Sequence, residues 1–186
     1  MRRIICSIVS VIYTIIRCII WKSLPYSKIT IKGLLRFSPD VVCEFDRGSR
    51  VSLGHRVRVH SGCKIKVRNK ASLNIGDEVR LNYGCIIVCR EHISIGSGTG
   101  IAPYVLIYDH DHDIRDGHDL KTEFRTSPVI IGKNCWIGAH TMILRGSVIG
   151  DNCIIGAGSV VKGEIPPGTI YVQKRIDEFY SRKNKM

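Results

Sequence analysis

A six-residue period of aliphatic side chains is the feature that most constrains how this chain can fold. The period is clearest at Ile131, Ile137, Ile143, Ile149, Ile155 and Val161. Glycine directly follows four of these six residues. A period of six fits neither the 3.6-residue repeat of an α-helix nor the two-residue repeat of a β-strand. It is typical of a solenoid that turns a corner every six residues.

The same period extends toward the N-terminus in blocks of three hexads. The inward positions are Leu53, Val59, Ile65, Ile75, Leu81, Ile87, Ile95, Ile101 and Ile107. Four, two and eighteen extra residues follow Ile65, Ile87 and Ile107, in each case after a third hexad. Three hexads make one triangular coil, so every insertion should leave from the same corner. The sequence predicts an all-β solenoid, a parallel β-helix of about five coils, which the proline pair before Gly168 should end.

We expect three segments along the chain. Residues 1–28 form an apolar helix, residues 29–172 form the β-helix with a protruding loop at 108–128, and residues 173–186 form a short helical tail over the open end. The first helix carries a narrow polar stripe made of Ser7, Ser10, Thr14 and Arg17. It fits an interfacial membrane helix best, while packing on the solenoid or on a neighbouring subunit is the structural alternative. A true membrane span would place Arg17 in the apolar layer, and is disfavoured.

Charge and cysteine usage bound the partners and the compartment. The 28 Lys and Arg outnumber the 16 Asp and Glu, which gives a net charge of +12 and suggests an anionic partner. No nucleic-acid-binding motif accompanies this charge, so we expect no nucleic acid. The eight cysteines include no CxxC pair, which makes a zinc site unlikely. Four of them occupy small inward slots, which favours buried thiols in a reducing compartment, the cytoplasm. With the apolar helix, we expect the protein at the inner face of a membrane.

The segment IGxxCWIGAHxxILxGxxIGDNCIIGAGSVV, which begins at Ile131 and is followed by IPPG, resembles the hexapeptide-repeat acyltransferases. This family includes galactoside, maltose, serine and polysaccharide O-acetyltransferases, and the resemblance covers about Val51 to Val172. It implies a left-handed β-helix, three subunits packed side by side about a threefold axis, and acetyl-CoA in the cleft between neighbours. No metal is expected as a cofactor.

The eighteen-residue insertion carries the titratable groups. Asp109-His110-Asp111-His112-Asp113 opens it, and Arg115 and His118 follow. The resemblance places the catalytic histidine sixteen residues before Pro128, which is His112, and leaves His110 as the second candidate. A neutral imidazole would take the proton from a substrate hydroxyl that attacks the thioester. Since side chains alternate in an extended segment, we expect His110 to point away from His112. A metal site and a plain solvated loop are the weaker alternatives.

The remaining site residues divide into an acceptor set and a cofactor set. Asp109, Asp111 and Glu91 are candidates for contacts with the acceptor. By resemblance Asn82 lines the acceptor pocket, while Arg90 stands where the family has an acidic residue. The resemblance assigns the pantetheine cleft to Trp136, Gly138, Ala139, Gly156 and Ala157. Lys162, Lys174 and Arg175 are candidates for the CoA phosphates, because they are charged donors near the end of the coil. We interpret Gly132 and Gly150 as corner residues.

The favoured function is transfer of an acetyl group from acetyl-CoA to a sugar hydroxyl of a surface polysaccharide or a lipid-linked glycan precursor. A sugar N-acetyltransferase and a serine acetyltransferase are enzyme alternatives. A β-helical scaffold without catalysis is the alternative from another class.

Overall fold

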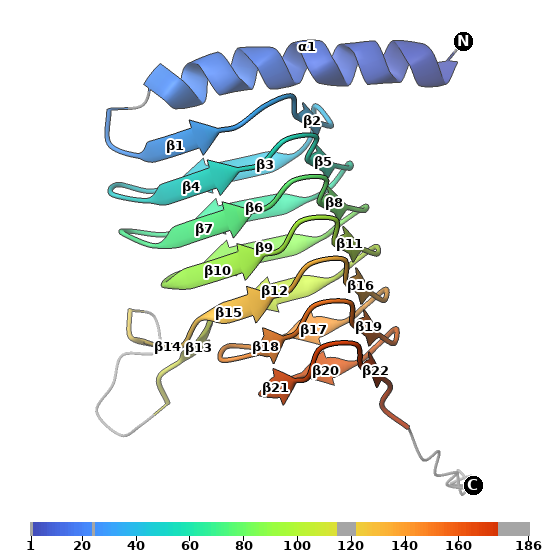
Figure 1. The fold of residues 1–186 in the computed structure, drawn as a ribbon. Helices are drawn as coiled ribbons and strands as arrows, with labels where there is room; N and C mark the ends of the chain where they lie inside the picture. Colours follow the sequence, from blue (N-terminus) through green and yellow to red (C-terminus); the bar gives the residue numbers. More distant parts are fainter. Residues whose placement is uncertain (1, 24, 115–121, 175–186) are drawn as a thin grey trace, which may run out of the picture.

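The computed structural model describes residues 2–23, 25–114 and 122–174, and shows a three-sided column of parallel strands under one helix (Figure 1). Sheet A consists of β1 (Lys28–Ile31), β4 (Arg50–Leu53), β7 (Ser72–Ile75), β10 (His92–Ile95), β15 (Val129–Ile131), β18 (Val148–Ile149) and β21 (Glu164–Ile165). Sheet B consists of β2 (Arg36–Phe37), β5 (Arg58–Val59), β8 (Arg80–Leu81), β11 (Gly100–Ile101), β16 (Trp136–Ile137), β19 (Ile154–Ile155) and β22 (Ile170–Tyr171). Sheet C consists of β3 (Val42–Phe45), β6 (Lys64–Val67), β9 (Ile86–Cys89), β12 (Leu106–Tyr108), β17 (Met142–Ile143) and β20 (Val160–Val161).

The chain visits sheets A, B and C in turn and descends one strand spacing with each circuit. It runs along sheet A at the front, turns into sheet B and returns behind along sheet C, which is a left-handed path (Figure 1). Six complete coils form, and β21 and β22 begin a seventh. The predicted β-helix is therefore confirmed, and the predicted number of five coils was too low.

The structure adds one coil before the predicted repeat and two strands, β21 and β22, after it. The first coil places Ile31, Phe37 and Cys43 in register with Leu53, Val59 and Ile65 of the second. An aromatic residue and a cysteine in the inward slots hid this coil from a pattern of Ile, Leu and Val. At the other end, the proline pair does not stop the strands. Pro166 and Pro167 occupy a corner between β21 and β22, where the ladder needs no N–H donor.

The core is the stack of inward side chains that the hexad predicts. The inward aliphatics from Leu53 to Val161 are at most 2% exposed. The four cysteines assigned to the small inward slots are equally buried: Cys63, Cys85, Cys135 and Cys153. None of these four cysteines takes part in a disulfide.

The helix α1 (Arg2–Ser23) packs across the first coil (Figure 1), and Thr14 and Arg17 of its polar stripe face the column. The Thr14 hydroxyl accepts a hydrogen bond from the Phe37 N–H at 2.9 Å. The Arg17 guanidinium donates to the Pro39 carbonyl at 2.5 Å. The sequence left packing of this helix on the solenoid as an alternative, and the structure shows that packing. Within the described residues, no helix has the length and apolar character needed to cross a bilayer.

Three edges separate the sheets, and we name them by the sheets they join. All insertions, including the one after β12, leave at the C–A edge, as predicted. At the A–B edge a Cβ on Gly132 would lie 2.6 Å from the backbone nitrogen of Asp151 in the next coil. At the B–C edge a Cβ on Gly138 would lie 2.5 Å from the backbone nitrogen of Ala157. Glycine at these corners lets one coil approach the next.

Gly138 and Gly156 occupy equivalent corners of neighbouring coils and make a matched pair of variants. Gly138→Ala should lower the free energy of unfolding by about 1–3 kcal/mol, because the new Cβ meets rigid backbone. Gly156→Ala should cost much less, since its Cβ would lie 3.3 Å from the movable Val172 side chain. Urea unfolding of both variants checks this, and equal losses would contradict the stacking explanation.

Candidate active site

The titratable segment forms a hairpin that projects from the C–A edge. The strands β13 (His110–His112) and β14 (Phe124–Thr126) pair antiparallel, with His110 opposite Thr126 and His112 opposite Phe124. The hairpin follows β12 and precedes β15, so it lies between the fourth and fifth coils. Arg115 and His118 lie outside the described residues.

Asp109 fixes the root of this hairpin to the coil above it. Its carboxylate is fully buried. It accepts hydrogen bonds from the Arg90 N–H at 2.8 and 3.0 Å and from the Glu91 N–H at 2.7 Å. Burial by itself raises the pKa of Asp109, but the hydrogen bonds from His110 and from these backbone groups outweigh it, and the pKa is lowered. Asp109 is therefore an ionised anchor between two coils.

His110 is held by that anchor. Its Nδ1 lies 3.2 Å from the Asp109 carboxylate, and its side chain is 11% exposed. The ring packs edge-on between Tyr108 and Phe124, with ring centroids 5.7 and 5.5 Å away. These contacts fix the orientation of the ring at the base of the hairpin.

His112 lies beside His110 on the same face of β13. It is exposed, and its ring centroid is 4.8 Å from that of Phe124. The expectation that His110 points away was wrong, because residues two apart on a strand share a face. Phe124 is the platform for both rings, and the sequence reasoning missed it. The sequence could have pointed to Phe124, because it is the one Phe, Tyr or Trp within 109–128.

The side chains around the hairpin hold it in place from both sides. Asp111 alternates to the opposite face of β13 and forms an ion pair with Arg145 of the next coil, at 2.5 Å. The Arg90 guanidinium lies 3.4 Å from the centroid of Phe124. Glu91 is exposed beside it. The role of Asp111 as a contact for the acceptor stays a prediction, and its observed role is to tie the hairpin to the column.

The other predicted site residues lie at the B–C edge or on sheet B, apart from Lys162. Asn82 is half-buried at the B–C edge, where its side-chain oxygen accepts from the Tyr83 N–H at 2.9 Å. The same edge carries Gly138, Ala139, Gly156 and Ala157 one coil apart, and the exposed Lys174 follows β22. Trp136 is exposed on sheet B. Lys162 follows β20 at the C–A edge. Arg175 lies outside the described residues.

The histidines and most of the predicted cofactor residues thus stand at opposite edges of sheet C in one chain. Together they would make a site only where the C–A edge of one subunit meets the B–C edge of another. Within the described part of the chain, no group of three metal-ligating side chains comes together.

Residues 128–163 match the family described as bacterial transferase hexapeptide, six repeats. This matched segment of the chain carries hexapeptide repeats. This confirms the resemblance that the sequence suggested. WbbJ of Escherichia coli (strain K12), named provisionally as a lipopolysaccharide biosynthesis O-acetyl transferase, is 33% identical over 107 residues, which cover 52% of this chain and 55% of that protein. Galactoside O-acetyltransferase of the same strain is 37% identical over 80 residues, 42% of this chain and 38% of that protein. The chain spans about half or less of the length of these relatives.

Among solved structures, the fold resembles AntD, an N-acyltransferase from Bacillus cereus. A point mutant of AntD, in complex with dTDP-4-amino-4,6-dideoxyglucose and coenzyme A, superposes with a TM-score of 0.67 at 21% identity, and the match covers 90% of each chain. At this identity the likeness concerns the fold.

Removing the Asp109 charge should loosen the root of the hairpin. Asp109→Asn leaves backbone N–H groups of Arg90 and Glu91 facing an amide, and should cost about 1–3 kcal/mol of stability at neutral pH. Asp151→Asn is the control variant, because the exposed Asp151 carboxylate accepts a hydrogen bond from the Lys133 N–H at 2.7 Å. It should lose less stability than Asp109→Asn.

The same pair of variants gives a pH dependence with a definite sign. The pKa of Asp109 is lower in the folded than in the unfolded chain, so its stabilisation is present above an unfolded pKa of about 4 and is lost as the pH falls below it. Urea unfolding at neutral and acid pH should show the deficit of Asp109→Asn shrink in acid. A deficit that is constant with pH would contradict the ionised anchor.

Proposed function

We propose that this chain is an acetyl-CoA-dependent O-acetyltransferase that acts on a sugar hydroxyl, in a surface polysaccharide or a lipid-linked glycan precursor. The observation that carries the proposal is the anchored hairpin, which presents two histidines side by side at an edge of a hexapeptide solenoid. The names of the matching relatives support O-acetyl transfer. The AntD complex supports coenzyme A and a nucleotide sugar as the kind of ligand such a column binds.

In the proposed reaction His112 is the general base and His110 positions the hairpin. His112 is the more exposed ring, whereas His110 is nearly buried against Asp109. His112 takes the proton of the sugar hydroxyl as its oxygen attacks the thioester carbonyl. The carbon–sulfur bond breaks, and the imidazolium returns the proton to the departing CoA thiolate. No covalent acyl-enzyme is needed.

His112→Ala should lower kcat about 10²–10⁴-fold, the usual contribution of a positioned base. The affinity for CoA and the melting temperature should stay near those of the wild type, because the side chain is exposed on the hairpin. Labelled acetyl-CoA with a panel of nucleotide sugars, amino sugars and polyprenyl-linked glycans measures the rate and identifies the acceptor.

Full activity in His112→Ala would refute the base assignment, and His110→Ala, assayed in parallel, would show whether the neighbouring ring serves instead. Transfer to amino sugars alone would replace O-acetylation by N-acetylation. Absence of transfer to the whole panel, with no CoA binding, would favour the scaffold.

The proposed enzyme is a homotrimer in which sheet C faces the threefold axis. Sheet C has two outward rows in register. One holds Glu44, Lys66, Val88 and Tyr108, and the other holds Val42, Lys64, Ile86, Leu106, Met142 and Val160. Five of these six are apolar, and Val42, Met142 and Val160 are each about 40% exposed. By contrast, the outward residues of the first four strands of sheet A are polar. An apolar row on the open face of a parallel sheet calls for a cover. Three copies around this face would bring the C–A edge of each beside the B–C edge of the next.

Met142→Lys should therefore dissociate the trimer and abolish transfer, although His112 is intact. Val148→Lys, on the outward face of sheet A, places the same charge at a similarly exposed position and should leave the trimer whole. Light scattering after size-exclusion chromatography measures the mass. If Val148→Lys alone dissociated the trimer, the interface would lie on sheet A and the proposed face would be wrong.

We further propose that α1 gives the enzyme a peripheral contact with the inner face of the membrane, where lipid-linked acceptors are found. The apolar outer face of α1 supports this location.

A further inference from the structure

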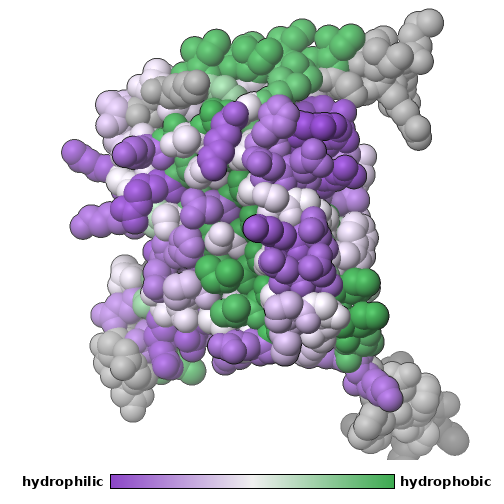
Figure 2. Space-filling view, viewed as in Figure 1, coloured by the Kyte–Doolittle hydropathy of each residue, from purple (hydrophilic) through white to green (hydrophobic). Residues whose placement is uncertain are grey.

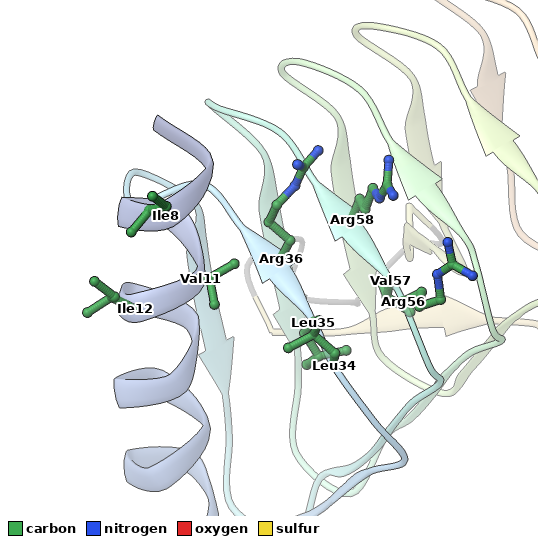
Figure 3. Close-up of a pocket in the computed structure, with 9 residues that line it drawn as sticks. All are labelled: Ile8, Val11, Ile12, Leu34, Leu35, Arg36, Arg56, Val57 and Arg58. Atoms are coloured by element: carbon green, nitrogen blue, oxygen red, sulfur yellow. The ribbon is translucent and has the colours of Figure 1, made fainter. Parts of the chain in front are cut away.

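A groove of about 390 Å³ runs between α1 and the first two strands of sheet B. One wall is apolar and comes from Ile8, Val11, Ile12, Leu34, Leu35 and Val57. On the strand side, Arg36, Arg56 and Arg58 also line the groove (Figure 3). The proposed active site uses none of these residues.

The arginines belong to a ladder of like charges. Arg36, Arg58 and Arg80 occupy the same outward position on β2, β5 and β8, in direct register. Neighbouring strands lie about 4.8 Å apart, and like charges directly opposite each other destabilise a sheet. Burial, and then the charges of Arg36, Arg80 and Arg56, lower the pKa of Arg58. Arg56 has a partner in Glu78 at 3.3 Å. An anion bound along this ladder would add a negative charge beside these like charges.

The outer face of α1 continues the apolar wall of the groove around the end of the column. Large aliphatic residues are exposed along it: Ile8, Ile12, Ile15, Ile16, Ile19 and Ile20. Figure 2 shows a hydrophobic band along α1, above the hydrophilic surface of the upper coils. An exposed apolar band of this length marks an interaction surface.

We propose that this groove seats an anionic phospholipid of the bilayer on which α1 lies. The phosphate binds Arg36 and Arg58, the acyl chain lies against Val11, Leu34 and Leu35, and the outer face of α1 enters the interface. The inference rests on the proposed peripheral location and names its ligand. Guanidinium groups match phosphate geometry, and the apolar wall fits hydrocarbon, which a nucleic acid or free phosphate lacks. Anionic lipid also complements the net charge of +12.

The lipid in the groove is an anchor and not the acceptor. The groove lies on sheet B of the first two coils, whereas the hairpin with His112 leaves the C–A edge after the fourth coil. In a side-by-side trimer the three copies of α1 would lie at the same end of the assembly. Three grooves would then bind one membrane at once, which strengthens attachment beyond that of a single site.

Vesicle co-sedimentation of the whole chain tests the groove. Vesicles of phosphatidylcholine with phosphatidylglycerol should bind the protein, and pure phosphatidylcholine should bind it much less. The double variant R36Q/R58Q should weaken binding to the anionic vesicles roughly tenfold or more, since each basic residue near the surface contributes. The control K28Q/R50Q removes two equal charges from the exposed side of sheet A in the same two coils, and should lose far less.

Several results would overturn the proposal. Equal losses in the two double variants would mean general electrostatic attraction without a groove. Inorganic phosphate that displaces the protein from vesicles at low millimolar concentration would assign the arginines to a free anion. A hexamer in light scattering that Ile16→Gln splits into trimers would assign the outer face to a second copy of the chain. The proposed acetyltransferase activity is tested separately, because R36Q/R58Q should transfer acetyl to a soluble acceptor at the wild-type rate whether or not the groove binds lipid.

Discussion

The backbone ladder that stacks one coil on the next is the constraint on which the rest of this structure depends. Leu53, Ile75, Ile95 and Ile131 keep strict register on sheet A, although the chain between them varies from 20 to 36 residues. Parallel strands tolerate extra residues only where the ladder is interrupted, which is at the three edges, and the insertions of the described repeat leave at the C–A edge. The faces are therefore fixed by the fold, and the hairpin with its histidines stands at an edge.

The same ladder leaves its first strands without partners at the open end, and this explains the orientation of α1. A surface helix usually turns its apolar side inward. Here Thr14 and Arg17 face the column, because the strand backbone at Phe37 and the carbonyl at Pro39 require hydrogen-bond partners. The Trp21 ring packs edge-on against both Phe37 and Phe45. The apolar side is consequently turned outward, so the need to cap a sheet end creates the exposed band.

The sequence was sufficient for the features that depend on the period alone. The hexads located the inward residues, the three-sided coil and the edge from which the insertions leave. They could not reveal a first coil whose slots hold Phe37 and Cys43, nor a corner that accepts two prolines. The contacts of the hairpin were beyond the sequence for another reason. The bonds of Asp109 to Arg90 and Glu91 join separate coils, and the shared platform at Phe124 depends on how the hairpin pairs.

Two features of a single chain are incomplete, and one arrangement would complete both. One outward row of sheet C is largely apolar, with Val42, Met142 and Val160 exposed, and the histidines stand across that sheet from most of the predicted cofactor residues. In the proposed homotrimer, three columns about an axis in front of sheet C would bury the apolar row. The same arrangement would bring Gly138 and Gly156 of one column toward His112 of its neighbour. Because burial of the row and assembly of the proposed site would require the same symmetry, loss of the interface and loss of catalysis should be inseparable in the proposed enzyme.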